Sequence, residues 1–286
     1  MAATRATLRI RVPPDAPSQR RRHFRPAHVL TLLRRMPGPR PTGPAPARAY
    51  ARVDHQHVSR VSYLHSGDPA GARVVFVHGC PGSADGWRAY LRETPAGRSH
   101  VAIDRPGFGR SDPAGAVASL QAQAAAVASL VGERKAVLVG HSLGGSIVAR
   151  AAVDYPERVG ALVIVAGALD PSLERIHPAQ RLGEWGPIRQ LLPRAVRNAN
   201  RELLALQGEL DALAPALASI TAPTFVVHGT RDNLVPFANV AFMEEAMIGC
   251  PLEIFELVDR NHFLPWHSRA LVEAAIDRAF ERMGAG

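Results

Sequence analysis

Cysteine is scarce in this chain of 286 residues, which contains only Cys80 and Cys250. Two cysteines cannot build a disulfide framework or a cysteine-based metal cluster. The sequence also lacks zinc-ligand spacing, a Walker motif and a dinucleotide-binding fingerprint, because the lone Gly-x-Gly of PGFGRS at 106–111 is too weak to count as one. The residues themselves therefore give no sign of a metal or a nucleotide cofactor.

Acidic residues are nearly absent from residues 1–52, which hold twelve arginines and a single acid, Asp15. The formal charge of this segment is thus +11, and the remaining residues carry −2 of the total of +9. Its one apolar patch, HVLTLL at 28–33, is far shorter than the roughly 20 residues of a membrane-spanning helix. Because the rest of the chain is close to neutral, the basic balance does not indicate specific nucleic-acid binding.

Residues 1–52 are rich in proline and arginine and show no sustained hydrophobic period, so we predict a mostly disordered extension. RRHFR at 21–25 resembles a twin-arginine export signal, with ARA at 47–49 as a cleavage site, but Arg34 and Arg35 interrupt the apolar region. We predict a cytoplasmic protein. The alternatives are export, and weak contact of the basic tail with an anionic membrane surface or nucleic acid.

From residue 53 to 286, β-branched runs alternate with helical patterns, and 47% of the chain is hydrophobic, which is ample for a large core. This alternation indicates an α/β fold with a mostly parallel sheet covered on both faces. A segment at about 170–218 has helical patterns and no clear strand, so it is predicted to be a helical cap inserted between two strands. The expected strands are 57–64, 73–78, 100–104, 135–140, 161–167, 224–229 and 252–257.

Chemically interesting groups follow the strands, at the edge where ligands bind in such sheets. Gly140-His141-Ser142-Leu143-Gly144 fits G-x-S-x-G, with a strand before it and a helix after it. Ser142 is therefore a candidate nucleophile on a sharp turn, although serine and glycine also fill ordinary turns. The helix that begins near Leu143 would direct free N–H groups at developing negative charge.

A serine hydroxyl needs a base, and His262 in DRNHFLPW after the last strand is the best candidate. Asp232 in HGTRDNLVP is the best candidate to orient that histidine, and Asp170 is the alternative acid. The backbone N–H groups of Leu143 and Cys80 would form the oxyanion hole. We interpret the Cys80 side chain as a small group in a tight loop rather than a second nucleophile.

Together, VVFVHGCPGS, DRPGFGRSD, VLVGHSLGG, VVHGTRDNLVP and RNHF resemble the α/β-hydrolase superfamily over roughly residues 55–283. The resemblance implies an eight-stranded, mostly parallel sheet, a cap after the sixth strand, no cofactor, and a triad of Ser142, Asp232 and His262. A serine at the nucleophile position counts against haloalkane dehalogenases and soluble epoxide hydrolases. HGCPG and GHSLGG differ from the HGGPG and GGSWG of proline iminopeptidases.

We expect a serine hydrolase that cleaves a carboxylic ester of a small, hydrophobic acyl substrate through an acyl-enzyme intermediate. The alternatives are hydrolysis of an amide, a thioester or the C–C bond of a diketone, or a non-catalytic ligand-binding member of the fold. Arg189, Arg194 and Arg197 could hold a carboxylate or be solvated. The apolar residues expected to line the site from the cap, or to pack it on the core, are Leu182, Trp185, Ile188, Leu191, Leu192, Leu203, Leu204 and Leu206.

Overall fold

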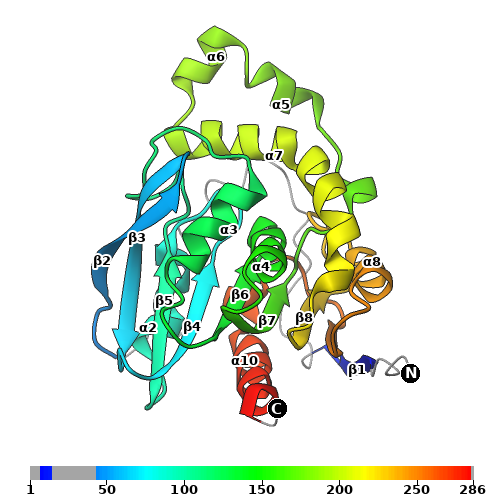
Figure 1. The fold of residues 1–286 in the computed structure, drawn as a ribbon. Helices are drawn as coiled ribbons and strands as arrows, with labels where there is room; N and C mark the ends of the chain where they lie inside the picture. The colour runs from blue at the N-terminus through cyan, green and yellow to red at the C-terminus, as the bar shows by residue number, and fades with distance from the viewer. Residues whose placement is uncertain (1–6, 15–42, 285–286) are drawn as a thin grey trace.

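A computed structural model describes residues 7–14 and 43–284 of the chain. Nine strands form one sheet in the order β1-β9-β8-β7-β6-β4-β5-β3-β2 (Figure 1). The pairs β2–β3 and β3–β5 are antiparallel, and the other neighbours are parallel. The strands are β1 Thr7–Val12, β2 Ala47–His55, β3 Val58–Gly67, β4 Ala72–Val77, β5 Arg98–Ile103, β6 Ala136–His141, β7 Val159–Val165, β8 Thr224–Gly229 and β9 Leu252–Leu257.

The central strands are apolar on both sides because helices cover both faces of the sheet. In β4, Val75 and Val77 face one hydrophobic cluster while Val74 and Phe76 face the other, and all four are 0% exposed. The first cluster includes residues of α3, α4 and α8, and the second includes residues of α2 and α10. The helices outside the cap are η2 Ala84–Trp87, α2 Arg88–Arg92, α3 Leu120–Ala128, α4 Leu143–Asp154, α8 Asn239–Ala246, α9 Leu264–His267 and α10 Arg269–Gly284.

The N-terminal part of the chain corrects two expectations from the sequence. Residues 7–12 form the edge strand β1 beside β9, with Ile10 and Val12 packed on the second cluster, so the prediction of disorder is wrong there. Strand β2 begins at Ala47, so residues 47–52 also belong to the sheet and the predicted boundary at 53 is too late. With β1 and β2 added to the seven strands expected from the sequence, the sheet has nine strands, one more than the eight that the resemblance implies. The twin-arginine-like motif at 21–25 lies outside the described residues.

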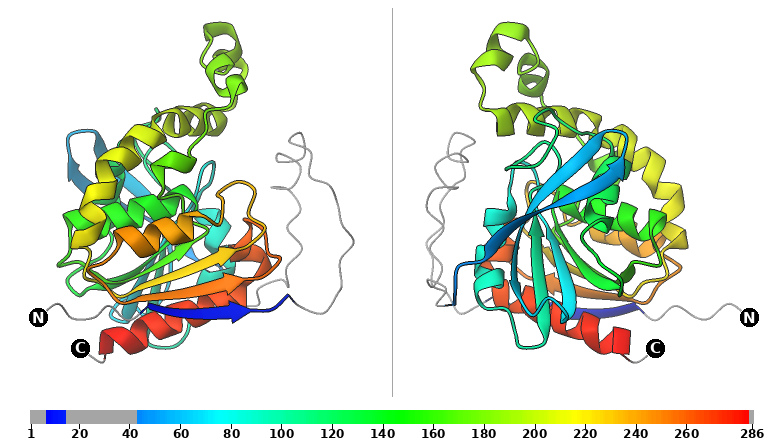
Figure 2. Two further views of the ribbon diagram at one scale, coloured as in Figure 1. Left: turned by 90° about the vertical axis from the view of Figure 1, so that its right-hand side faces the viewer. Right: turned by 60° about the vertical axis from the view of Figure 1, so that its left-hand side comes forward.

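Helices of the cap lie between β7 and β8, over the carboxyl ends of the parallel strands (Figure 1). The long helix α7 crosses this end of the molecule, and α5 and α6 lie beyond it, projecting away from the sheet (Figure 2). Within residues 7–14 and 43–284, no helix is both long and apolar enough to cross a membrane. The cap elements are η3 Pro171–Leu173, α5 Pro178–Leu182, α6 Gly186–Leu191, α7 Arg194–Leu213 and η4 Ala214–Ser219.

Candidate active site

Ser142 lies in the tight turn between β6 and α4, where its backbone has φ 57° and ψ −127°. This conformation is sparsely populated by non-glycine residues and costs on the order of 1–3 kcal/mol. A Cβ atom on Gly140 would lie 2.2 Å from the carbonyl oxygen of Gly144, and one on Gly144 would lie 2.4 Å from the carbonyl oxygen of Val77. The turn therefore requires glycine on both sides of Ser142.

The loop after β4 passes directly beside Ser142. A Cβ atom on Gly79 would lie 2.8 Å from the Ser142 Cβ and 3.3 Å from its Oγ. The next residue along this loop, Cys80, and the first residue of α4, Leu143, each have a backbone N–H without a hydrogen-bond partner among the described residues. Free N–H groups next to a helix N-terminus can stabilise an anion.

His262 and Asp232 are directly hydrogen-bonded, as the sequence order suggested. The Nδ1–H of His262 donates to Oδ2 of Asp232 over 2.7 Å, and both residues are buried. Oδ1 of Asp232 accepts from the backbone N–H groups of Leu234 and Val235, each over 2.9 Å. Burial raises the pKa of Asp232, but the hydrogen bond and charge of His262, with smaller effects of the Val235 N–H and of His228, hold that pKa below its usual value. This carboxylate is therefore ionised and fixed in orientation.

The alternative acid, Asp170, does not reach His262 in this structure. Its Oδ1 accepts from the backbone N–H and the hydroxyl of Ser172, over 2.9 and 2.7 Å, and so caps the short helix η3. These bonds are local and lie at the start of the cap. The geometry favours Asp232 as the partner of the histidine.

His141 joins the Ser142 turn to the His262 loop. Its Nε2–H donates to the carbonyl oxygen of His262 over 3.0 Å, and the two ring centroids are 4.7 Å apart. Burial, together with a smaller effect of the neighbouring His262, lowers the pKa of His141 to about 3. With so low a pKa, the His141 ring is neutral near pH 7, and the proton it donates is on Nε2. No role for His141 could be predicted from the sequence, because it occupies a variable position of the G-x-S-x-G motif.

Buried neutral histidines should make the protein lose stability as the pH falls below about 6.5. Burial lowers the pKa of His141 to about 3 and that of His100 to about 4, whereas both bind a proton near pH 6.5 when unfolded. The unfolded state then holds more protons, so each contributes a fall of about 1.4 kcal/mol per pH unit between pH 6.5 and its folded pKa. Urea unfolding from pH 7.5 to 5 measures this slope.

A matched pair of histidine variants isolates the contribution of one ring. His100→Asn should reduce the slope of unfolding free energy against pH by the contribution of about one proton, because the variant lacks a ring that titrates differently in the folded and unfolded states. His57→Asn should leave the slope as in the wild type, since His57 is exposed. Equal slopes for wild type and His100→Asn would contradict the explanation.

A buried ion pair ties the cap to the loop beside Ser142. Arg105, which follows β5, is 0% exposed and donates from Nη1 and Nη2 to Oε1 and Oε2 of Glu202 in α7, over 3.0 and 2.9 Å. Nη2 of Arg105 also donates to the carbonyl oxygen of Gly79 over 3.1 Å. Gln123 donates from Nε2 to Oε1 of Glu202 over 2.9 Å. The position of α7 is thus coupled to the loop that carries the Cys80 N–H.

The side chain of Cys80 belongs to the same hydrogen-bond network around Glu202. Its Sγ–H donates to Oε2 of Glu202 over 3.1 Å. Burial and the charge of Glu202 raise the pKa of the Cys80 thiol well above its usual value. A thiol that stays protonated is a poor nucleophile, so its geometry agrees with a packing role in the loop.

The cap residues expected to line the site divide into three groups in the structure. Leu182, Trp185 and Leu191 are exposed and do not line it, which corrects the expectation for these three. Ile188 and Leu192, together with the exposed Leu182, line a groove within the cap itself. The remaining three, Leu203, Leu204 and Leu206, lie on α7, where Leu206 is buried in the first cluster and Leu203 packs against it.

Among the described residues, no three His, Cys, Asp or Glu side chains converge as metal ligands would. The polar residues of the site are instead engaged with one another or with backbone groups. The arrangement holds a serine, a histidine and an ionised aspartate at one edge of the sheet, with free N–H groups beside the serine. Such an arrangement can support proton transfer and stabilise an oxyanion.

Residues 74–275 match the model of the alpha/beta hydrolase family. The chain belongs to the alpha/beta hydrolase family. The match spans most of the sheet, the cap and all the candidate site residues. The α/β-hydrolase fold expected from the sequence motifs is therefore confirmed.

Proteins named for different reactions are similar to the chain. An acetyltransferase component of the acetoin cleaving system from Cupriavidus necator is 30% identical over 249 residues, 76% of this chain but only 65% of that protein. A 2-hydroxy-6-oxononadienedioate/2-hydroxy-6-oxononatrienedioate hydrolase from Paraburkholderia phymatum is 37% identical over 221 residues, 62% of this chain and 76% of that one. A pimeloyl-[acyl-carrier protein] methyl ester esterase from Citrobacter koseri is 29% identical over 217 residues, 64% and 84% of the two chains.

Proposed function

We propose that this alpha/beta hydrolase is a serine hydrolase that cleaves a carboxylic ester through an acyl-enzyme intermediate. The hydrogen bond from His262 to the ionised Asp232 is the observation that carries the proposal, because it prepares a base at the sheet edge that holds Ser142. The similarity to a methyl ester esterase supports the same bond type.

The reaction follows from the roles of these groups. His262 accepts the proton of Ser142 as its Oγ attacks the acyl carbonyl, and the N–H groups of Cys80 and Leu143 stabilise the oxyanion. Asp232 keeps the proton of His262 on Nδ1, so that Nε2 is free to act as the base, and it stabilises the imidazolium. His262 then protonates the leaving alcohol. Water activated by His262 finally hydrolyses the acyl-enzyme and releases the acid.

Hydrolysis of a C–C bond is the second candidate. The observation in its favour is the similarity to the Paraburkholderia phymatum hydrolase, whose identity of 37% exceeds that to the methyl ester esterase. The same serine, histidine and oxyanion donors could act on the ketone of a diketone substrate, because a triad does not fix the leaving group. The two functions therefore differ in substrate rather than in the residues used.

Labelling with a fluorophosphonate followed by stopped-flow kinetics tests the ester proposal. We expect the label on the peptide that contains Ser142, since only an activated hydroxyl reacts. A p-nitrophenyl ester series from acetate to decanoate should show turnover, with a burst of about one p-nitrophenolate per enzyme where deacylation is slow. A vinylogous diketone is assayed beside the esters. Faster turnover of the diketone than of every ester would favour C–C hydrolysis, and an unlabelled, folded protein would exclude both reactions.

A further inference from the structure

The outer end of the cap concentrates exposed apolar side chains. Eight large hydrophobic residues are exposed in the described parts of the chain, and four of them lie within residues 176–191. Their exposed fractions are 37% for Ile176, 56% for Leu182, 62% for Trp185 and 85% for Leu191. They belong to α5, α6 and the adjoining turns, which project from the end of the molecule opposite α10 (Figure 2). Clustered exposure of this kind marks an interaction surface.

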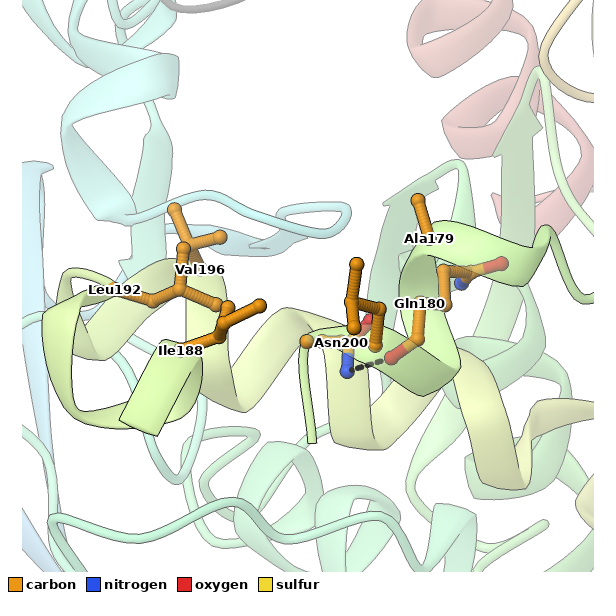
Figure 3. Close-up of a pocket in the computed structure, with 8 residues that line it drawn as sticks. Ala179, Gln180, Ile188, Leu192, Val196 and Asn200 are labelled. Carbon is orange, nitrogen blue, oxygen red and sulfur yellow. Dashed lines mark hydrogen bonds between the residues drawn. The ribbon is translucent and has the colours of Figure 1, made fainter. Parts of the chain in front are cut away.

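An apolar groove lies beside these residues, between α5, α6 and α7. Its volume is about 270 Å³, and Ile188, Leu192 and Val196 cluster at one end of it (Figure 3). At the other end, Nδ2 of Asn200 donates to the carbonyl oxygen of Gln180 over 2.9 Å. The packing of the short helices on α7 therefore leaves apolar surface open rather than buried.

The charge of this end of the molecule is opposite to that of the rest of the domain. Residues 175–197 contain five arginines and one acid, a formal charge of +4, whereas all other residues from 53 to 286 carry −6. The acid, Glu184, is already paired with Arg201 over 3.0 Å. Arg175, Arg181, Arg189 and Arg197 form no ion pair within the described residues. The arginines are thus available to an external anion.

We propose that the outer end of the cap, residues 175–197, docks onto an anionic lipid bilayer. Trp185 and Leu191 would enter the interface between headgroups and acyl chains, where tryptophan and aliphatic side chains are favoured. The flanking arginines would contact lipid phosphates, each adding attraction that depends on ionic strength. Exposed aliphatic side chains and unpaired arginines on the same short segment are complementary to a lipid surface in both polarity and charge. This surface is independent of the proposed ester hydrolysis.

Co-sedimentation of the full chain with vesicles tests the docking. The protein should bind vesicles of phosphatidylcholine mixed with phosphatidylglycerol more tightly than vesicles of phosphatidylcholine alone. Trp185→Ser/Leu191→Ser should weaken binding to the anionic vesicles by at least about ten-fold, because two inserted side chains are lost. Arg181→Gln/Arg189→Gln should weaken binding at low salt and reduce its salt dependence. Wild type should also show a blue shift of tryptophan fluorescence on binding, which Trp185→Phe should largely remove.

Ile248→Ser is the matched control, because Ile248 is 62% exposed but lies outside the cap. It should bind vesicles as the wild type does. The basic segment 1–52 is unchanged in every variant, so binding through that segment alone would leave all the variants equal to wild type, and this result would overturn the proposal. Absence of wild-type binding to anionic vesicles would also overturn it, and would direct the search to an acidic protein partner.

Discussion

Ser142→Ala is expected to lower kcat for an aryl ester by at least about 10⁴-fold, because the variant lacks the hydroxyl that would form the acyl-enzyme. Circular dichroism and the urea midpoint should remain close to those of the wild type. The strained backbone of Ser142 is accepted by alanine no worse than by serine, so the fold gives no reason for destabilisation. Steady-state kinetics on p-nitrophenyl butyrate, together with fluorophosphonate labelling, measure the effect.

Two aspartate variants form the control for this result. Asp232→Asn should lower kcat by about 10⁴-fold, because an amide facing Nδ1 disfavours the tautomer that leaves Nε2 as a base. Asp170→Asn should keep kcat near the wild-type value, since Asp170 bonds only to Ser172 through its side chain. A large loss from Asp170→Asn with little loss from Asp232→Asn would reverse the assignment of the acid. Wild-type turnover by Ser142→Ala would contradict the assignment of Ser142 as the nucleophile.

Glu202→Ala is expected to lower the free energy of unfolding by about 3–5 kcal/mol, since it leaves the guanidinium of Arg105 buried without a counter-charge. Arg105 is 0% exposed and Glu202 is 2% exposed, so the guanidinium stays shielded from bulk water when the carboxylate is removed. Urea unfolding measures the loss. The control is Glu184→Ala, which removes the exposed pair with Arg201 and should cost less than about 1 kcal/mol.

A double variant separates stability from positioning. Arg105→Met/Glu202→Leu should recover much of the stability, because apolar residues often replace a buried ion pair without a large cost. Its kcat should still be at least about ten-fold below wild type, because the Gly79 carbonyl keeps only His78 as a partner after it loses Arg105, and the loop with the Cys80 N–H is less well fixed. A stable double variant with wild-type kcat would show that the ion pair only holds the cap in place.

Much of the fold could be predicted because the central strands are short apolar runs with unambiguous neighbours. The two strands that were missed lie at opposite edges of the sheet. In β1, the residues Leu8 to Val12 alternate apolar and arginine, but six residues inside a proline- and arginine-rich segment are too few to outweigh its composition. Arg9 and Arg11 are accommodated there because they pair with Glu244 and Glu256, acids that lie more than 200 residues away in the chain.

Some residues of the site could be predicted from local sequence patterns, whereas others depend on contacts between distant parts of the chain. Ser142 could be found from one motif, and Asp232 and His262 from their positions after strands. Arg105 and Glu202 could not be paired, because their contact depends on how α7 lies across the sheet, which no local pattern encodes. The one available signal was an acid in the otherwise apolar face of NRELLAL at 200–206. The exposed side chains of the cap were misassigned for the same reason, since periodicity shows an apolar face but not what covers it.

Strand β1 also bears on how the sheet meets other molecules. It pairs with β9 from Thr7 opposite Leu252 to Val12 opposite Leu257, and so occupies the backbone N–H and C=O groups on one side of β9. An unpaired edge of that kind is a template for intermolecular strand pairing and aggregation. During synthesis β1 is made long before β9, so the strand that protects this edge is already present when β9 emerges. The edge of β9 can therefore be covered as soon as that strand forms, whereas β1 waits without its sheet partner while the strands between them are made.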